Sequence, residues 1–299
     1  MTISTSAKIG PYRRGPRTGT AAASKAASVL CATQCSNCNL RGLCMPCCGL
    51  TRFEREAADR LDFKRSHLRR GEMLYRAGER FNFLYAVRTG FFKCTVLLEN
   101  GRRDQVTGFS MAGEVLGMDG IGSERQTCNA IALEDSNVCA VPYAGLIELA
   151  REIPSLQHQM RKTMSDEIVR ESGMILLLGT MNADERLAMF LLNLSRRFAA
   201  RGYSASEFNL RMTRDEIGSY LGLKLETVSR IFSKFQEEGL IGVQQKFVRI
   251  LDAAGLERVM GRDPHWNTAG ATGNGRRMGA DRRRRAALAA PITGRARTS

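Results

Sequence analysis

The chain has 299 residues, of which 43% are hydrophobic and 25% charged, and its formal net charge is +15. This length allows two ordinary domains, and no apolar run is long enough to predict a membrane-spanning helix. The excess charge lies mostly at the ends, because residues 1–30 carry five basic side chains and no acid and residues 261–299 carry nine arginines against two aspartates. Both ends are rich in small residues, so we expect residues 1–30 and 255–299 to be disordered basic tails.

The segment Ala21–Leu30 lacks the apolar centre of a signal peptide, since it consists mainly of Ala and Ser and is interrupted by Lys25. We therefore expect a cytoplasmic protein whose thiols stay reduced. In such a protein, clustered cysteines favour a metal site over disulfides.

Six of the nine cysteines lie within residues 31–48, and we assign residues 31–52 to a cysteine-rich metal-binding segment. The first four have the spacing C-x3-C-x2-C-x5-C and are Cys31, Cys35, Cys38 and Cys44. Four thiolates suit an iron–sulfur cluster, but they also suit zinc. The spacing therefore predicts a local four-cysteine site and leaves its metal open.

Residues 53–153 are expected to form a β-rich domain. Residues 53–66 hold apolar positions scattered among charges and predict a short helix. From His67 to Tyr143, short apolar or alternating runs are divided by Gly-containing turns, of which Asn100-Gly101 is a hairpin signal. Short strands at this spacing predict an antiparallel barrel or sandwich.

A long helix is predicted over residues 154–181, because Pro154 suits a first helical turn and no other proline follows. Methionines and leucines recur in a heptad-like seam, which is typical of a dimer interface. Acids on this seam would face their own copy and oppose association, so the pattern indicates a dimer close to its dissociation threshold. The alternative is that the acids turn to solvent and the helix packs within one chain. The expected interface residues are Met160, Met164, Glu167, Ile168, Glu171, Met174, Ile175 and Leu178.

Residues 182–254 predict a winged helix-turn-helix. Thr213 and Glu216 form a capping box that opens the helix 214–221, and Gly222 separates it from a second helix at about 224–238. Two short runs at 240–251 then predict a β-hairpin wing. The second helix has an apolar face, on which we place Leu225, Val228, Phe232 and Phe235. Its polar face carries side chains that can bond base edges, and the expected DNA contacts are Glu226, Thr227, Ser229, Arg230 and Lys234.

This order of domains resembles the CRP/FNR superfamily of transcription regulators, and the match is closest to its oxygen-sensing FNR branch. It covers about residues 31–251. The motifs that carry it are Cys35-Ser-Asn-Cys38, Leu43-Cys44-Met-Pro46, Leu84–Gly90, Gln105–Phe109, Met174–Leu178 and Glu226–Arg230. The resemblance implies an α+β fold with a cyclic-nucleotide-binding-like β-roll, a long dimerisation helix and a C-terminal winged helix-turn-helix.

The resemblance also implies a ligand set that spacing alone does not indicate. In FNR-type proteins three N-terminal cysteines and one from the β-domain hold a [4Fe–4S] cluster, and these match Cys35, Cys38, Cys44 and Cys139. Cys31 matches a cysteine that is not a ligand. The same resemblance implies a homodimer that binds TTGAT-type palindromes, contacts RNA polymerase and controls anaerobic genes.

Two other classes of function are less consistent with the sequence. The nucleotide-binding branch uses a Gly-Glu pair and a later Arg-Ser or Arg-Thr pair; here Gly113-Glu114 is present, but Gln126 separates Arg125 from Thr127. An enzyme is not expected, because His67, His158 and His265 lie in no catalytic motif and there is no phosphate-binding or hydrolase signature. A nucleotide- or zinc-dependent regulator of the same superfamily remains the alternative.

Overall fold

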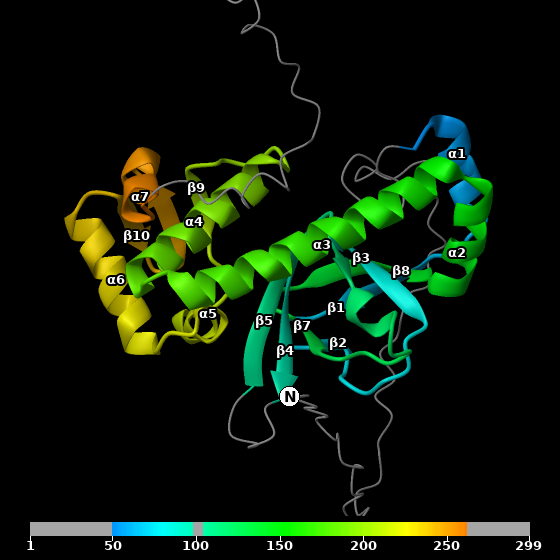
Figure 1. Ribbon diagram of the computed structural model, residues 1–299, viewed down its shortest axis with the longest axis horizontal. Helices are drawn as coiled ribbons and strands as arrows, with labels where there is room; N and C mark the ends of the chain where they lie inside the picture. Colours follow the sequence, from blue (N-terminus) through cyan, green and yellow to red (C-terminus); the bar gives the residue numbers. More distant parts are fainter. Residues whose placement is uncertain (1–49, 98–103, 262–299) are drawn as a thin grey trace, which may run out of the picture.

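The computed structural model describes residues 50–97 and 104–261 (Figure 1). The predictions for residues 1–30, for the cysteines up to Cys48, for the Asn100-Gly101 hairpin and for residues 262–299 lie outside this range. Within it, a β-rich N-terminal domain and a C-terminal domain are joined by one long helix, α3, which crosses the front of both in Figure 1.

The N-terminal domain is an antiparallel structure of two four-stranded sheets, with strand orders β1-β8-β3-β6 and β2-β7-β4-β5. A buried cluster that includes Val87, Phe92, Ala130 and Val138 fills the space between the sheets, which confirms the predicted sandwich-like class. The elements are α1 (Arg52–Ala58), β1 (Lys64–Leu68), β2 (Met73–Tyr75), β3 (Phe83–Thr89), β4 (Phe91–Leu97), β5 (Asp104–Met111), β6 (Val115–Leu116), η2 (Met118–Gly120), β7 (Asn129–Ala132), β8 (Ser136–Pro142) and α2 (Tyr143–Glu152).

The helix predicted over residues 53–66 is shorter than expected. Thr51 and Glu54 form a capping box that opens α1, but the helix ends at Ala58. Residues 64–68 are instead strand β1, which pairs with β8 from Lys64↔Ala140 to Leu68↔Ser136. Pairing with a strand about seventy residues away therefore overrides the local helical pattern, as tertiary context often does.

Helix α3 (Pro154–Thr180) begins at Pro154 as predicted and has 27 residues. A helix of this length spans about 40 Å, enough to touch both domains. Near its start, Leu156 and Met160 pack with α1 and α2 in one buried cluster. Near its end, Leu177 packs in the core of the C-terminal domain.

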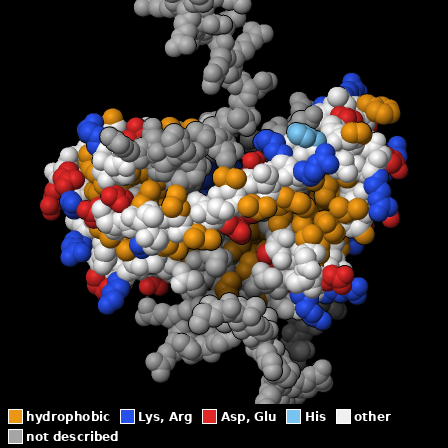
Figure 2. Space-filling view, viewed as in Figure 1, with side chains coloured by type: hydrophobic (Ala, Val, Ile, Leu, Met, Phe, Trp, Pro, Cys, Tyr) orange, Lys and Arg blue, Asp and Glu red, His pale blue; other side chains and the backbone are white. Residues whose placement is uncertain are grey.

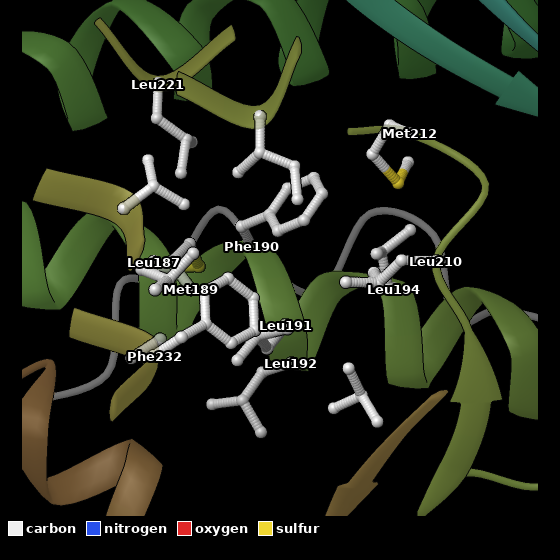
Figure 3. Packing of buried hydrophobic residues seen from close by; sticks show 14 of the residues in the cluster. Leu187, Met189, Phe190, Leu191, Leu192, Leu194, Leu210, Met212, Leu221 and Phe232 are labelled. Carbon is white, nitrogen blue, oxygen red and sulfur yellow. The ribbon is translucent and has the colours of Figure 1, made fainter. Parts of the chain in front are cut away.

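The C-terminal domain confirms the winged helix-turn-helix. Its elements are α4 (Ala183–Ala199), β9 (Glu207–Asn209), α5 (Arg214–Leu221), α6 (Leu225–Glu237), β10 (Ile241–Gln244), β11 (Phe247–Ile250) and α7 (Ala253–Val259). The wing strands β10 and β11 pair antiparallel, and β9 adds to β11. Figure 3 shows side chains of α4, among them Leu187 and Leu191, gathered around Phe232 of α6.

The predicted tail from residue 255 begins too early. Asp252 caps α7 by accepting a hydrogen bond from the Gly255 backbone N–H at 2.8 Å. Leu256 and Met260 are buried in the core of the C-terminal domain. The folded part of the chain therefore continues at least to Gly261. The Gly- and Arg-rich composition of the following segment led the sequence-based boundary to exclude these two buried apolar residues.

Candidate functional site

The helix-turn-helix is built by local signals in α5 and the turn that follows. Thr213 Oγ1 accepts a hydrogen bond from the Glu216 N–H at 3.2 Å, and the Glu216 carboxylate accepts one from the Thr213 N–H at 2.7 Å. Gly222 ends α5 with φ +65°, a conformation that favours glycine. Gly218 lets the turn close, because a Cβ there would lie only 2.6 Å from the Leu223 carbonyl oxygen.

Helix α6 has one buried and one polar exposed face. The buried residues are Val228, Ile231, Phe232 and Phe235. Leu225, which we had placed on the apolar face, is 43% exposed because it is the first residue of the helix and lies beyond the core. The exposed residues of the polar face are Glu226, Ser229, Arg230, Ser233 and Lys234, and Thr227 is half-buried beside them.

The side chains predicted to contact DNA differ in whether they already have a partner within the chain. Glu226 and Arg230 are exposed and form no side-chain hydrogen bond or ion pair within the described residues, so neither is held by a partner in the chain. Lys234 instead donates a hydrogen bond to Asp184 Oδ2 at 2.6 Å, and this bond raises the pKa of the ammonium group. Since Asp184 lies in the first turn of α4, this ion pair links the exposed face of α6 to α4.

A partly buried ion-pair network joins the two domains, and sequence reasoning missed it. The Glu114 carboxylate accepts hydrogen bonds from Arg197 at 2.6 and 3.0 Å and from Arg201 at 2.7 Å. Burial alone would raise the pKa of Glu114, but the guanidinium groups of Arg197, Arg201 and Arg170 outweigh it and lower the pKa to about 2. Glu114, which we weighed as part of a phosphate pocket, is therefore committed to contacts with the C-terminal domain.

Strands β4 and β5 also dock directly on α5, the first helix of the helix-turn-helix. Lys93 Nζ lies 2.7 Å from Glu216 Oε1, so the residue that closes the α5 cap also pairs with the N-terminal domain. The Val106 N–H donates to Ser219 Oγ at 2.9 Å. The rings of Phe109 and Tyr220 meet edge to face at 5.1 Å. The N-terminal domain thus fixes the orientation of the reading unit.

Along α3, the predicted interface residues divide between two faces. Met160 and Met174 pack within this chain, the first buried beside α2 and the second half-buried against the C-terminal core. Their place in a dimer interface stays a prediction. The outward stripe consists of the half-buried Met164 and the exposed Ile168, Glu171, Ile175 and Leu178. Figure 2 shows hydrophobic side chains gathered along this side of α3 and on the N-terminal domain beside it.

The two seam acids also differ. Glu167 pairs with Arg170 one turn away, and this arginine interacts electrostatically with Glu114 and Tyr220. Glu167 therefore already has a partner within the chain, and its place in a dimer interface stays a prediction. Glu171 is exposed and makes no ion pair within the described residues. It stands between Ile168, which is 63% exposed, and Ile175, which is 74% exposed.

Cys139 is the one predicted metal ligand that lies among the described residues. It is 8% exposed in β8, where its cross-strand partners are Arg65 in β1 and Ala86 in β3. Two residues along the same face, Val141 packs in one cluster with Leu50.

The chemistry of this position fits a thiolate-ligated cluster, because a buried thiol lies beside the small Ala86 on the face where Leu50, the first described residue, packs. The described residues by themselves contain no group of three or more His, Cys, Asp or Glu side chains that could hold a metal ion. A metal site at Cys139 would need ligands from Cys35, Cys38 and Cys44, which lie outside the described range.

A β-roll joined by a long helix to a winged helix-turn-helix with a free polar reading face defines a class, that of two-domain DNA-binding regulators. The comparisons agree. The Crp-like helix-turn-helix domain family matches residues 185–259, and the cyclic nucleotide-binding domain family matches residues 65–152. The chain belongs to the CRP/FNR family of transcription regulators and is not an enzyme.

Three curated relatives are similar over most of their length. The transcriptional regulatory protein btr of Bordetella pertussis is 44% identical over 232 residues, which cover 78% of this chain and 95% of btr. FnrA of Stutzerimonas stutzeri, a transcriptional activator protein, is 44% identical over 74% of this chain and 90% of its own. The fumarate and nitrate reduction regulatory protein of Escherichia coli K12 is 42% identical over 77% of this chain and 92% of its own.

Among solved structures, FixK2 from Bradyrhizobium japonicum is 29% identical, covers 68% of this chain and 99% of its own, and superposes with a TM-score of 0.61. No helix in the described part of the chain is long and apolar enough to cross a membrane.

Proposed function

We propose that this protein is an oxygen-responsive regulator in which a [4Fe–4S] cluster controls dimerisation and thereby DNA binding. Cys35, Cys38, Cys44 and Cys139 would hold the cluster, which supplies the reactivity with oxygen. The observation that carries the proposal is the position of Cys139, buried on the face where Leu50, the first described residue, packs. The resemblance of the N-terminal motif and the FNR-named relatives support it.

The route from this site to α3 runs through contacts of the described residues. One buried cluster contains Leu50 after the cysteine segment, Ala58 of α1, Val141 of β8 and both Leu156 and Met160 of α3. The Ser155 hydroxyl also donates a hydrogen bond to the Glu54 carboxylate, which links α1 to the first turn of α3. Fixing the cysteine segment against β8 would therefore restrain the start of α3.

The outward stripe of α3 explains why such restraint would matter. Ile168, Ile175 and Leu178 offer apolar contacts to a second copy, whereas Glu171 opposes its own counterpart across the two-fold axis. Because this repulsion opposes the apolar contacts, the dimer would form only when α3 is held in the position in which those contacts are largest. Paired, the two α6 helices would enter successive major grooves about 34–36 Å apart.

DNA readout would fall to Glu226, Ser229 and Arg230, with Thr227 and Lys234 beside them. Arg can bond guanine through two donors, and a carboxylate can accept from cytosine N4, so this set suits a TTGAT-type half-site. We infer a cytoplasmic homodimer that contacts RNA polymerase at anaerobic promoters. Its parts are the cysteine segment 31–52, the β-roll 53–153, the dimer helix 154–181 and the DNA-binding domain from 182 to at least 261.

The full chain purified without oxygen should be brown and contain about four iron and four sulfide per chain. Admission of air should bleach the colour, convert dimer to monomer in sedimentation experiments and abolish binding to a palindromic duplex. Cys139→Ser should lose the iron, whereas Cys128→Ser, which removes a buried cysteine elsewhere in the β-roll, should keep it. Colourless protein with one zinc per chain would overturn the proposal in favour of a zinc-dependent regulator.

A further inference from the structure

Arg65 of β1 is half-buried, and one nitrogen of its guanidinium group is buried without a partner. Its Nε atom is buried and has no hydrogen-bond acceptor, and the side chain makes no ion pair within the described residues. Buried donors are rarely left unpaired in native proteins, and an ion or cofactor missing from the coordinates is one reason for such an atom. The position of Arg65 therefore needs a chemical explanation.

The register of the sheet places this cation beside the candidate ligand. Arg65 in β1 and Ala86 in β3 both pair with Cys139 in β8, so the three residues form one row across adjacent strands. Directly paired residues of antiparallel strands project from the same face. Cys139 is the middle residue of this row, with Arg65 on one side and the small, buried Ala86 on the other.

We propose that Arg65 is the positioning residue that neutralises the negative charge of the cluster at Cys139, provided that Cys139 is a ligand as proposed above. A thiolate-ligated cluster carries net negative charge, and the Arg65 guanidinium can donate to the thiolate or to an inorganic sulfide. A charge-assisted bond of this kind satisfies the orphaned donor. It also holds the one ligand that comes from the β-roll.

This role predicts two measurable effects, neither of which is DNA binding. Removal of the cation should weaken retention of iron, because the buried negative charge loses its counter-charge. It should also lower the reduction potential of the bound cluster, since a neighbouring donor or cation stabilises the more reduced, more negative form. For a one-electron couple, a tenfold change in equilibrium constant corresponds to about 59 mV.

The chain offers a matched control in Arg88 of β3. Its Nε atom is also buried without an acceptor and belongs to the same sheet, but Arg88 does not pair with Cys139. Arg65→Gln removes the charge at nearly the same length, and Arg65→Lys keeps the charge. The melting temperature of each iron-free protein reports folding separately from the cluster.

The anaerobic full-chain protein is mixed with a ferrous chelator and the rate of iron loss is measured. R65Q should lose iron about tenfold faster than wild type and have a lower reduction potential. The rates of iron loss of R65K and Arg88→Gln should stay within about threefold of the wild-type rate. The role of Arg65 is refuted if R65Q matches wild type, if R65K loses iron as fast as R65Q, or if the Arg88 variant behaves like R65Q. If wild-type protein shows no cluster absorbance at all, the proposed function fails instead. If R65Q does not fold when iron-free, R65A takes its place under the same criteria.

Discussion

Replacement of Glu114 by Gln would test how the two domains of this regulator are held together. Glu114 accepts hydrogen bonds from Arg197 and Arg201, and its side chain is 18% exposed. Glu114→Gln keeps the size of the side chain and removes its charge. Two guanidinium groups would then remain at the domain interface without a carboxylate, which is the costly way to break a buried ion pair.

The size of the effect follows from the pKa of Glu114, which is lowered from 4.5 to about 2. Each pKa unit corresponds to about 1.4 kcal/mol, so the ionised carboxylate contributes about 3 kcal/mol to the folded state. Because the folded-state pKa is the lower one, this contribution is complete above about pH 4.5 and is lost as the pH falls toward 2.

Urea unfolding of the full chain at pH 7, followed by circular dichroism, should show a loss of about 3 kcal/mol for Glu114→Gln. Glu134→Gln is the control, since Glu134 also bridges the two domains, by an ion pair to Arg211 at 2.9 Å, but is 31% exposed. Exposed pairs contribute less than about 1 kcal/mol. Equal losses in the two variants, or a Glu114→Gln deficit that does not shrink below pH 4.5, would refute the assignment of the interface energy to Glu114.

Three further outcomes are expected. Glu171→Ala should raise the dimer fraction in air, measured by sedimentation, because it removes a like-charge repulsion of about 2 kcal/mol for carboxylates about 8 Å apart at an effective dielectric constant near 20. Asp166→Ala, which breaks a pair with Lys162 off the seam, should leave the dimer fraction unchanged. Arg230→Ala should relax discrimination at one base pair by about 1–3 kcal/mol in competition gel shifts, and a uniform loss over all sequences would make Arg230 a phosphate contact. Gly218→Ala should lower the melting temperature of the protein because its Cβ would meet the Leu223 carbonyl oxygen at 2.6 Å, whereas Gly179→Ala in α3 meets nothing within 4 Å and should not.

Local signals in the sequence were sufficient for the DNA-reading unit. The Thr213–Glu216 capping box and Gly222 fix the ends of α5 through bonds that span only a few residues. The boundaries of α6 and the positions of Glu226, Ser229 and Arg230 on its exposed face follow from the helical repeat. Such features depend on neighbours along the chain, so a single sequence contains the information needed to predict them.

For helix α3, local signals in the sequence do not determine which face packs against the rest of the chain. Its apolar residues form two adjacent stripes, one through Met160 and Met174 and one through Ile168 and Ile175, and both are compatible with a heptad-like seam. Only the packing of Met160 against α2 and of Met174 against the C-terminal core shows which stripe is turned inward. The register of the helix was therefore decided by contacts with other elements.

By itself, then, the sequence determined the kind of domains, their order and the reading face, because periodicity, caps and motifs are local. The tertiary structure alone decided which partners distant residues acquire. Glu114 meets Arg197 across 83 positions, and strand pairing makes Arg65 the cross-strand neighbour of Cys139. The spacing of residues along the chain predicts neither pairing. The energy of a charged group in the folded protein depends on the groups that folding brings near it and not on its neighbours in sequence.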